Sequence, residues 1–363
     1  MDYPGRLRRL SAQLVSPQEV SRQVDALLVT HLPNVRYLTG FTGSAAVLLA
    51  SAKPMFFTDG RYREQAAQQV RGAKVVIPRG NALSAAVKAC QAQRITRLGV
   101  EADRMSVSQF QTLRRELGKG VKIVPLVGVV EALRAVKDPA EIMLIRQAVE
   151  LSSGLFPALL KALKPGQTEL SAAARLEYLA RKAGAEAMSF ETIIASGKRS
   201  ALPHGVASPA RLPARGFVVL DYGVVTQGYS SDMTRTIHLG RATARERAVY
   251  AAVLEAQLAG INALRPGATC GQVDEAARRV LRRAGLAKFF THSTGHGVGL
   301  EIHEPPRLGA RGEAVLEAGM VVTVEPGAYL PGRYGVRIED MVLVTATGAE
   351  VLTPVGKALT ELL

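Results

Sequence analysis

Residues 162–168 read ALKPGQT and residues 263–269 read ALRPGAT, so the same turn recurs 101 positions later. A second pair of blocks, RKAG at 181–184 and RRAG at 282–285, keeps the same offset. Two matches at one offset favour a duplicated unit over the independent recurrence of a Pro-Gly turn. Each copy reads as helix, turn, helix and glycine stop, followed by β-rich sequence. We therefore predict two similar α/β halves around a pseudo-two-fold axis.

The sequence before the duplicated part predicts a separate, smaller domain in which β-rich runs alternate with helical patterns. The β-rich runs cover residues 26–30, 45–49, 55–58 and 75–77, and the helical patterns cover 61–70, 82–93 and 106–117. That alternation is typical of an α/β layer. A long amphipathic helix then begins at Asp138-Pro139, where a capping residue precedes a proline suited to the first helical turn. We place the domains at residues 1–130 and 131–363.

The composition is that of an ordered globular protein, because 47% of its 363 residues are hydrophobic. Lys and Arg exceed Asp and Glu by 15, but these residues are scattered and only 5% of residues are aromatic, which argues against a nucleic-acid partner. The two cysteines, Cys90 and Cys270, offer no disulfide framework. Neither a secretory leader nor a membrane span is evident, so we expect a cytoplasmic protein with no membrane partner.

A pair of aspartates points to a metal site. A wholly apolar strand ends in Asp221, and a second β-rich run covers residues 229–237. If the two strands pair around residues 226–227, Asp221 and Asp232 face each other. Like charges about 5 Å apart are destabilising unless a cation lies between them. The alternative is that one aspartate only caps the turn or pairs with Arg235.

The same arrangement recurs downstream with two glutamates and a histidine. An apolar run leads into Glu325, where an unpaired charge would be costly, and Glu339 lies in the next β-rich run. Between the two acidic pairs, His296 is flanked by glycines that allow close approach to an ion. Four carboxylates and one imidazole suit divalent ions such as Mn²⁺, Co²⁺ or Zn²⁺. The pattern predicts a two-metal hydrolase.

The motifs resemble those of the pita-bread metallopeptidases, and most closely the proline-specific members, prolidase and aminopeptidase P. They are DYG at 221–223, YSSDMTRT at 229–236, GHGVG at 295–299, HEPP at 303–306, EPG at 325–327 and RIE at 337–339. The resemblance covers nearly the whole chain, since residues 1 to about 130 are similar to a creatinase-type N-terminal domain. It implies an α+β, two-domain fold: a small α/β creatinase-type domain followed by a pseudo-two-fold pita-bread catalytic domain.

The resemblance also implies a role for each candidate site residue. The metal ligands are Asp221, Asp232, His296, Glu325 and Glu339, which would hold two divalent ions, with Mn²⁺ expected first. Glu325 would also act as general base and acid. His204 and His303 would contact the substrate and stabilise the tetrahedral intermediate, while His292 would line the proline pocket. Arg337, two residues before Glu339 on a strand, projects to the same face and would orient that region.

Arg307 bears on the choice between the two proline-specific activities. It follows HEPP where microbial prolidases carry an arginine that binds the substrate carboxylate, and arginine suits bidentate carboxylate binding. We therefore expect an Xaa-Pro dipeptidase, with aminopeptidase P acting on longer peptides as the alternative, and a surface role for Arg307 as the simpler interpretation. A non-catalytic pita-bread binding module is a third possibility, against which the intact ligand set argues. The resemblance further implies a homodimer.

Overall fold

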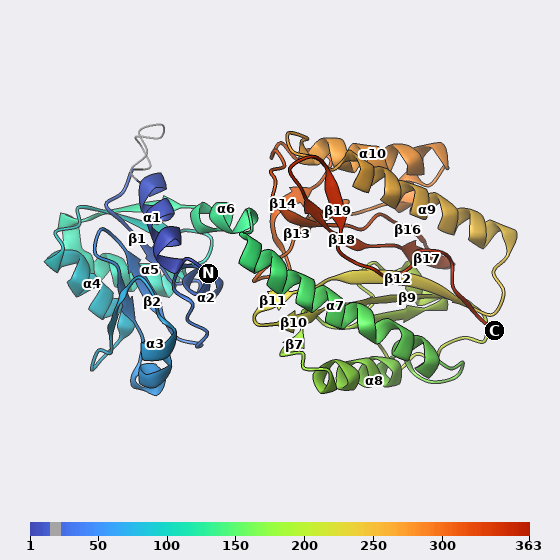
Figure 1. Cartoon of the computed structure of the whole chain (residues 1–363), viewed down its shortest axis with the longest axis horizontal. Helices are drawn as coiled ribbons and strands as arrows, with labels where there is room; N and C mark the ends of the chain where they lie inside the picture. Colours follow the sequence, from blue (N-terminus) through green and yellow to red (C-terminus); the bar gives the residue numbers. More distant parts are fainter. Residues whose placement is uncertain (15–22) are drawn as a thin grey trace. The chain divides into compact units, whose positions relative to one another are not determined.

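The computed structural model describes residues 1–14 and 23–363 (Figure 1). By its internal contacts the chain divides into two compact units, Met1–Arg134 and Ala135–Leu363. The boundary expected at residue 130 lies inside a helix, α6 (Val129–Ala135), which continues past it because no helix breaker interrupts this stretch. The structure thus has the two-domain α+β architecture expected from the sequence.

The first unit is an α/β layer around a six-stranded sheet of order β4-β3-β2-β1-β5-β6. Its strands are β1 (Ala26–Val29), β2 (Val47–Ala50), β3 (Met55–Phe57), β4 (Lys74–Val76), β5 (Arg97–Glu101) and β6 (Lys122–Leu126). Its helices are α1 (Tyr3–Leu14), α2 (Leu32–Thr39), α3 (Arg63–Gln69), α4 (Ala82–Ala92) and α5 (Val107–Leu117). The sequence patterns located β1 to β4 and α3 to α5, but missed β5, β6, α1 and α2.

The second unit contains two equivalent helix pairs, as the repeated blocks predicted. They are α7 (Pro139–Ala162) with α8 (Glu169–Lys182), and α9 (Ala244–Ala263) with α10 (Cys270–Arg283). The second helices of the pairs begin and end 101 residues apart, and each is capped by a threonine, Thr168 or Thr269. Gly166 and Gly267, in the turns before them, share a φ of 83° that favours glycine. The duplication is therefore structural.

The helix pairs lie on opposite sides of the strands of this unit (Figure 1). One sheet has the order β20-β12-β9-β8, another the order β14-β13-β15-β18-β19, and β11-β10-β7 and β16-β17 form small sheets. The strands are β7 (Ala187–Met188), β8 (Ile193–Ser196), β9 (Gly216–Tyr222), β10 (Val224–Thr226), β11 (Tyr229–Ser230), β12 (Met233–Leu239), β13 (Gly295–Gly297), β14 (Glu304–Leu308), β15 (Val321–Val324), β16 (Gly327–Leu330), β17 (Tyr334–Arg337), β18 (Asp340–Val344), β19 (Ala349–Val351) and β20 (Glu361–Leu362).

The predicted register of the first hairpin is wrong by one residue in the turn. Its two central residues are Gln227 and Gly228, both with positive φ (48° and 79°), as the favoured two-residue hairpin turns require. Asp221 consequently pairs with Thr234, not with Asp232. The ladder is interrupted between β11 and β12, and Asp232 lies in this interruption. The two aspartates are diagonal neighbours rather than directly opposed.

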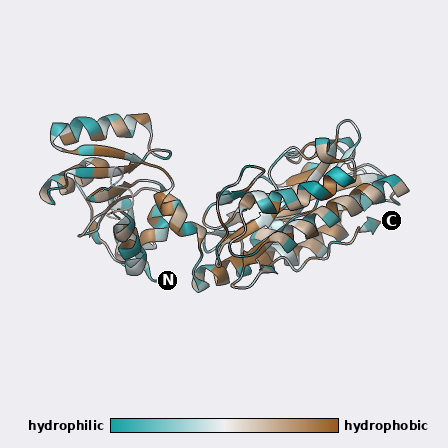
Figure 2. Cartoon of the chain, turned by 90° about the horizontal axis from the view of Figure 1, so that it is seen from above, coloured by the Kyte–Doolittle hydropathy of each residue, from teal (hydrophilic) through white to brown (hydrophobic). Residues whose placement is uncertain are grey.

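Hydrophobic residues gather on the strands, while the helices carry many hydrophilic positions (Figure 2). Among the described residues, α7 is long and apolar enough to cross a membrane by length and composition, with a mean hydropathy of 1.2 over its best window. Half of that window is buried inside the structure. The core helix of a water-soluble fold has the same properties, so this helix is weak evidence for a membrane span.

The duplicated caps predict equal contributions to stability. The Thr168 and Thr269 side chains accept hydrogen bonds from the backbone N–H groups of Ser171 and Gln272. We expect Thr168→Ala and Thr269→Ala each to lower the free energy of unfolding by about 1 kcal/mol in urea denaturation. Thr→Ser at either position keeps the hydroxyl and is the control. An alanine variant as stable as its serine counterpart would contradict the capping role.

Candidate active site

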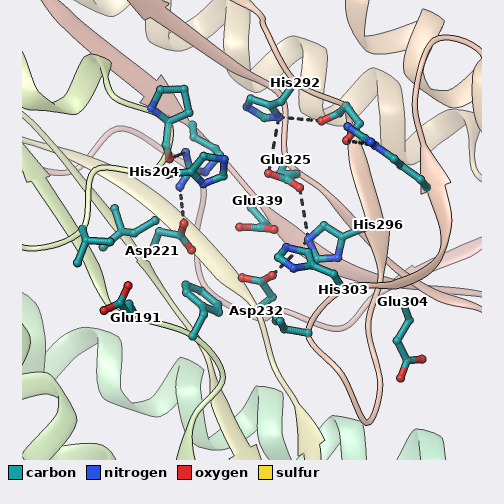
Figure 3. Close-up of a pocket in the computed structure, with 18 of the residues that line it drawn as sticks. Glu191, His204, Asp221, Asp232, His292, His296, His303, Glu304, Glu325 and Glu339 are labelled. Carbon is teal, nitrogen blue, oxygen red and sulfur yellow. Dashed lines mark hydrogen bonds and ion pairs between the residues drawn. The ribbon is translucent and has the colours of Figure 1, made fainter. Parts of the chain in front are cut away.

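The second unit contains a cavity of about 840 Å³ that all ten predicted site residues line (Figure 3). These residues are His204, Asp221, Asp232, His292, His296, His303, Arg307, Glu325, Arg337 and Glu339. They come from segments that span more than a hundred positions of the sequence, and the fold brings every one of them to the same place.

Breaks in the strands free the acidic side chains to face the cavity. Asp232 lies between β11 and β12, Glu325 between β15 and β16, and Glu339 between β17 and β18. Glycine allows the close backbone approach beside them: a Cβ at Gly295 would lie 1.9 Å from the Thr323 carbonyl oxygen. This approach brings β13, which carries His296, against β15, which leads into Glu325.

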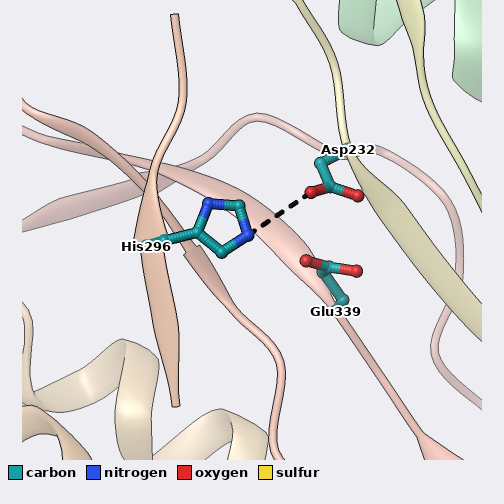
Figure 4. Close-up of side chains that lie close together, drawn as sticks. All are labelled: Asp232, His296 and Glu339. Carbon is teal, nitrogen blue, oxygen red and sulfur yellow. Dashed lines mark ion pairs between the residues drawn. The ribbon is translucent and has the colours of Figure 1, made fainter. Parts of the chain in front are cut away.

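Asp232, His296 and Glu339 form a cluster suited to a metal ion (Figure 4). One ligand atom from each lies within 4.8 Å of the others. The His296 Nε2 atom is 3.6 Å from Asp232 Oδ2 and 3.5 Å from Glu325 Oε1. These separations are too long for direct hydrogen bonds. They leave room for a cation among His296, Asp232 and Glu325.

The histidine is held in the form that a metal requires. His296 Nδ1 is 3.0 Å from the Gly297 carbonyl oxygen, which can only accept, so Nδ1 carries the proton. The lone pair of Nε2 therefore faces the carboxylates. Burial lowers the pKa of His296 to about 4, which keeps the ring neutral at pH 7. A neutral imidazole whose other nitrogen donates to a carbonyl is the usual metal-binding arrangement.

Asp221 also retains an unused acceptor that a cation fits. Its Oδ2 pairs with the Arg337 guanidinium, while its buried Oδ1 has no hydrogen-bond partner in the part of the chain that the structure describes. Arg337 in turn donates to Thr234 Oγ1 at 3.0 Å and to the Pro203 carbonyl oxygen at 2.9 Å. The buried arginine fixes one carboxylate oxygen and leaves the other directed at an unsatisfied position. The donor set of this cavity therefore fits hard divalent ions.

The carboxylates strongly perturb one another. Burial first, and then the charge of Glu339, raises the pKa values of Asp232 and Glu325 well above their ordinary values. Burial and the charge of Asp221 raise the pKa of Glu339 to about 8. Carboxylates this crowded need protons or cations to coexist. The Thr234 hydroxyl, 2.6 Å from Glu339 Oε2, holds one of them in position.

The alternative in which a hairpin aspartate pairs with Arg235 is wrong. Arg235 turns to the other side of the strand and binds Asp340 Oδ1 at 2.6 Å. It also donates to the carbonyl oxygen of Glu339, so it supports the backbone at that glutamate from outside the cavity. Neither Asp221 nor Asp232 is the partner of Arg235, and both line the cavity.

The other predicted residues surround the acidic cluster. The His303 ring meets the His296 ring edge-on, with centroids 4.4 Å apart, and burial lowers its pKa. His204 is exposed at the cavity wall. Arg307 pairs with His296 in the β13–β14 ladder and is exposed, its Nε 3.3 Å from Ser293 Oγ. No carboxylate within the described chain pairs with it.

Several functional positions were missed by sequence reasoning. The cavity also has apolar walls and two further glutamates, from Phe190, Glu191, Ile193, Val206, Ile302, Glu304 and Pro305. Apart from Pro305, which stands in the HEPP motif, the apolar residues read as ordinary strand or loop residues, and no motif marked them. Glu304 stood in a quoted motif without a role; its buried carboxylate pairs with Lys137 Nζ at 3.3 Å. Tyr329, which hydrogen-bonds both His292 and Arg337, also carried no signal in the sequence.

The known proteins to which this chain is similar include several peptidases. A Bacillus subtilis (strain 168) protein described as an uncharacterized peptidase is 39% identical over 98% of both chains. The structure of an Xaa-Pro dipeptidase from Bacillus anthracis matches with a TM-score of 0.95 and 40% identity, covering 99% of this chain and 100% of the other. That of an X-Pro aminopeptidase from Thermotoga maritima MSB8 matches with a TM-score of 0.87 and 36% identity, covering 93% and 98%.

Two family models account for nearly the whole chain. Residues 6–136 match the creatinase/prolidase N-terminal domain, and residues 143–346 match metallopeptidase family M24. The pseudo-two-fold second unit, with its acidic cavity, has the pita-bread fold of that family. Membership of the family implies divalent metal ions. The chain belongs to metallopeptidase family M24.

Proposed function

We propose that the protein hydrolyses Xaa-Pro peptide bonds with the help of two divalent metal ions, and that its main substrates are Xaa-Pro dipeptides. The observation that carries this proposal is the position of Arg307. It pairs in register with His296, so a cation that has no carboxylate partner among the described residues stands at the wall of the same cavity as the acidic cluster. A peptide bound there would have its scissile bond at the cluster and its terminal carboxylate near an arginine.

The proposed metal ligands are five of the residues that line the cavity: Asp221, Asp232, His296, Glu325 and Glu339. Ions bound by this set would polarise the scissile carbonyl and lower the pKa of a water molecule toward neutrality. We propose Mn²⁺ as the ion, with Co²⁺ and Zn²⁺ as alternatives of similar ligand preference.

The protein's own groups have separate tasks in this scheme. Glu325, which lies against Thr323 and His296, takes a proton from the attacking water and returns it to the leaving proline nitrogen. His303 and His204, on the cavity wall, donate hydrogen bonds to the tetrahedral intermediate. Arg337 keeps Asp221 oriented through their ion pair. His292 lines the pocket for the proline ring.

Proline requires a dedicated pocket because its peptide nitrogen carries no N–H. A peptidase that holds its substrate through that donor cannot grip an Xaa-Pro bond. Recognition must come from the ring and, in a dipeptide, from the free carboxylate. Arginine supplies paired N–H donors in the geometry of a carboxylate, which favours a dipeptidase with Arg307 as the anchor.

Removal of the N-terminal residue from longer Xaa-Pro peptides is the second candidate function. The similar Thermotoga maritima structure bears the name X-Pro aminopeptidase, whereas the Bacillus anthracis one bears the name Xaa-Pro dipeptidase. This chain is therefore similar to both kinds of relative, and the two activities differ only in the length of the substrate. A homodimer and a cytoplasmic location stay predictions.

Turnover of a matched substrate set tests the proposal. With added Mn²⁺ we expect rapid cleavage of Ala-Pro and slow cleavage of Ala-Pro-amide and Ala-Pro-Ala, because only the dipeptide offers its carboxylate next to proline. After chelation, activity should fall at least about 100-fold and return with the metal. Efficient cleavage of the tripeptide would favour the aminopeptidase. No metal-dependent cleavage of any of the three would contradict both candidates.

Replacing Arg307 separates carboxylate binding from the rest of recognition. Arg307→Ala should raise KM for Ala-Pro by about 10- to 100-fold, since an ionic hydrogen bond to the substrate is lost. It should change KM for Ala-Pro-amide far less. Arg311→Ala, an exposed arginine four residues away, is the matched control and should leave both values unchanged. Equal losses on the two substrates would remove the carboxylate role.

Metal binding should release protons at pH 7. The Glu339 carboxyl, with its pKa raised to about 8, is largely protonated in metal-free protein at this pH, and a cation must displace that proton. Apparent affinity for Mn²⁺ should therefore rise as the pH rises from the ordinary glutamate value of 4.5 toward 8. Titration calorimetry in two buffers of different ionisation enthalpy counts the protons. Identical heats in both buffers would contradict this expectation, and Glu339→Gln should lower the count.

A further inference from the structure

A buried tyrosine links the proline-pocket histidine to the arginine beside the acidic cluster. Tyr329, on β16, is 5% exposed. Its hydroxyl oxygen is 2.9 Å from His292 Nε2 and 2.8 Å from Arg337 Nη1. The ring fits because glycines surround it: Gly335 is its partner across the hairpin, and a Cβ at Gly327 would lie 2.6 Å from the hydroxyl.

The direction of each hydrogen bond in this chain follows from the partners. Arginine can only donate, so the Tyr329 oxygen accepts from Arg337. His292 Nδ1 lies 2.8 Å from the Ser293 carbonyl oxygen, which can only accept, so Nδ1 carries a proton. In a neutral ring Nε2 is then an acceptor. Among the described residues, the acceptor for the Tyr329 hydroxyl proton is His292 Nε2. Tyr329 therefore donates this hydrogen bond.

Both nitrogens of His292 are consequently occupied by the protein. Nδ1 also lies 3.9 Å from Glu325 Oε2, but its proton is directed to the Ser293 carbonyl oxygen, so among the described residues the ring keeps neither a free N–H nor a free lone pair for the cavity it lines. Phe290 supports this orientation from another side, its ring meeting the His292 ring edge-on with centroids 5.1 Å apart. A wall of this kind suits a proline ring, and it offers nothing to the N–H of an ordinary peptide bond.

We propose that Tyr329 is a specificity-determining positioning residue: together with the Ser293 carbonyl oxygen, its hydroxyl fixes His292 in the Nδ1–H tautomer, and so keeps the pocket selective for proline over residues with a peptide N–H. The inference rests on the proposed function, since it assigns His292 to the proline pocket. Tyr329 itself acts only through its neighbour. Without the hydroxyl, Nε2 would lose its partner, and the ring would be free to turn or to change tautomer.

Kinetics of Tyr329→Phe test the effect on the pocket, because this change removes only the hydroxyl. We expect KM for Ala-Pro to rise about tenfold with kcat within about twofold, the effect of losing an interaction made equally in ground and transition states. The preference for Ala-Pro over Ala-Ala should fall by a similar factor. Tyr334→Phe is the matched control, because the Tyr334 hydroxyl lies on the same hairpin, is buried and finds no hydrogen-bond partner among residues 1–14 and 23–363.

The tautomer has its own readout, which does not depend on activity. Two-bond ¹H–¹⁵N correlation spectra of histidine-labelled, Zn²⁺-loaded protein, assigned with His292→Gln, should show Nδ1–H for His292 in the wild type and in Tyr334→Phe. In Tyr329→Phe the pattern should shift toward a mixture. An Nε2–H ring in the wild type, or unchanged KM and selectivity in Tyr329→Phe, would overturn the inference. Absence of Ala-Pro turnover by wild-type protein would overturn the proposed function instead, while the spectra would still decide the tautomer.

Discussion

Mutual repulsion among buried carboxylates is the constraint that organises the second unit. Asp221, Asp232, Glu325 and Glu339 face one cavity, and three of them have pKa values raised by burial and by each other. Such a cluster is tolerable only when cations or protons occupy it. The strand breaks, the close glycine contacts and the buried arginine all serve to hold these groups at a common point despite that repulsion.

The two hairpins achieve this arrangement in different ways. In the second hairpin, β15–β18 and β16–β17 keep one register on either side of the break, which sets Glu325 opposite Glu339. In the first hairpin the register sets Asp221 opposite Thr234, and Asp232 lies two residues before Thr234. Thr234 also contributes to the site, because its hydroxyl donates a hydrogen bond to the Glu339 carboxylate. The halves are thus related in fold, yet each contributes its carboxylates with its own geometry.

The sequence predicted what depends on short-range pattern and on motif. Repeated turns gave the duplication, and apolar strands that end in acids gave the ligand candidates. It did not predict the register of the first hairpin, because the choice between turns at 226–227 and at 227–228 depends on which residues accept positive φ, and Gln227 gives no such signal. Tyr329 and Phe190 were missed for another reason. Their roles arise from neighbours distant in sequence, and locally they read as ordinary strand or loop residues.

Hydrogen bonds and an ion pair from the protein itself orient three of the side chains around the acidic cluster. Arg337 holds Asp221, Thr234 holds Glu339, and the Gly297 carbonyl sets the tautomer of His296. Each of these contacts leaves at least one donor atom directed into the cavity. Because the protein supplies the orientation, a metal ion has to displace protons but does not have to reorganise side chains. Little of the free energy of metal binding is then needed to order the site.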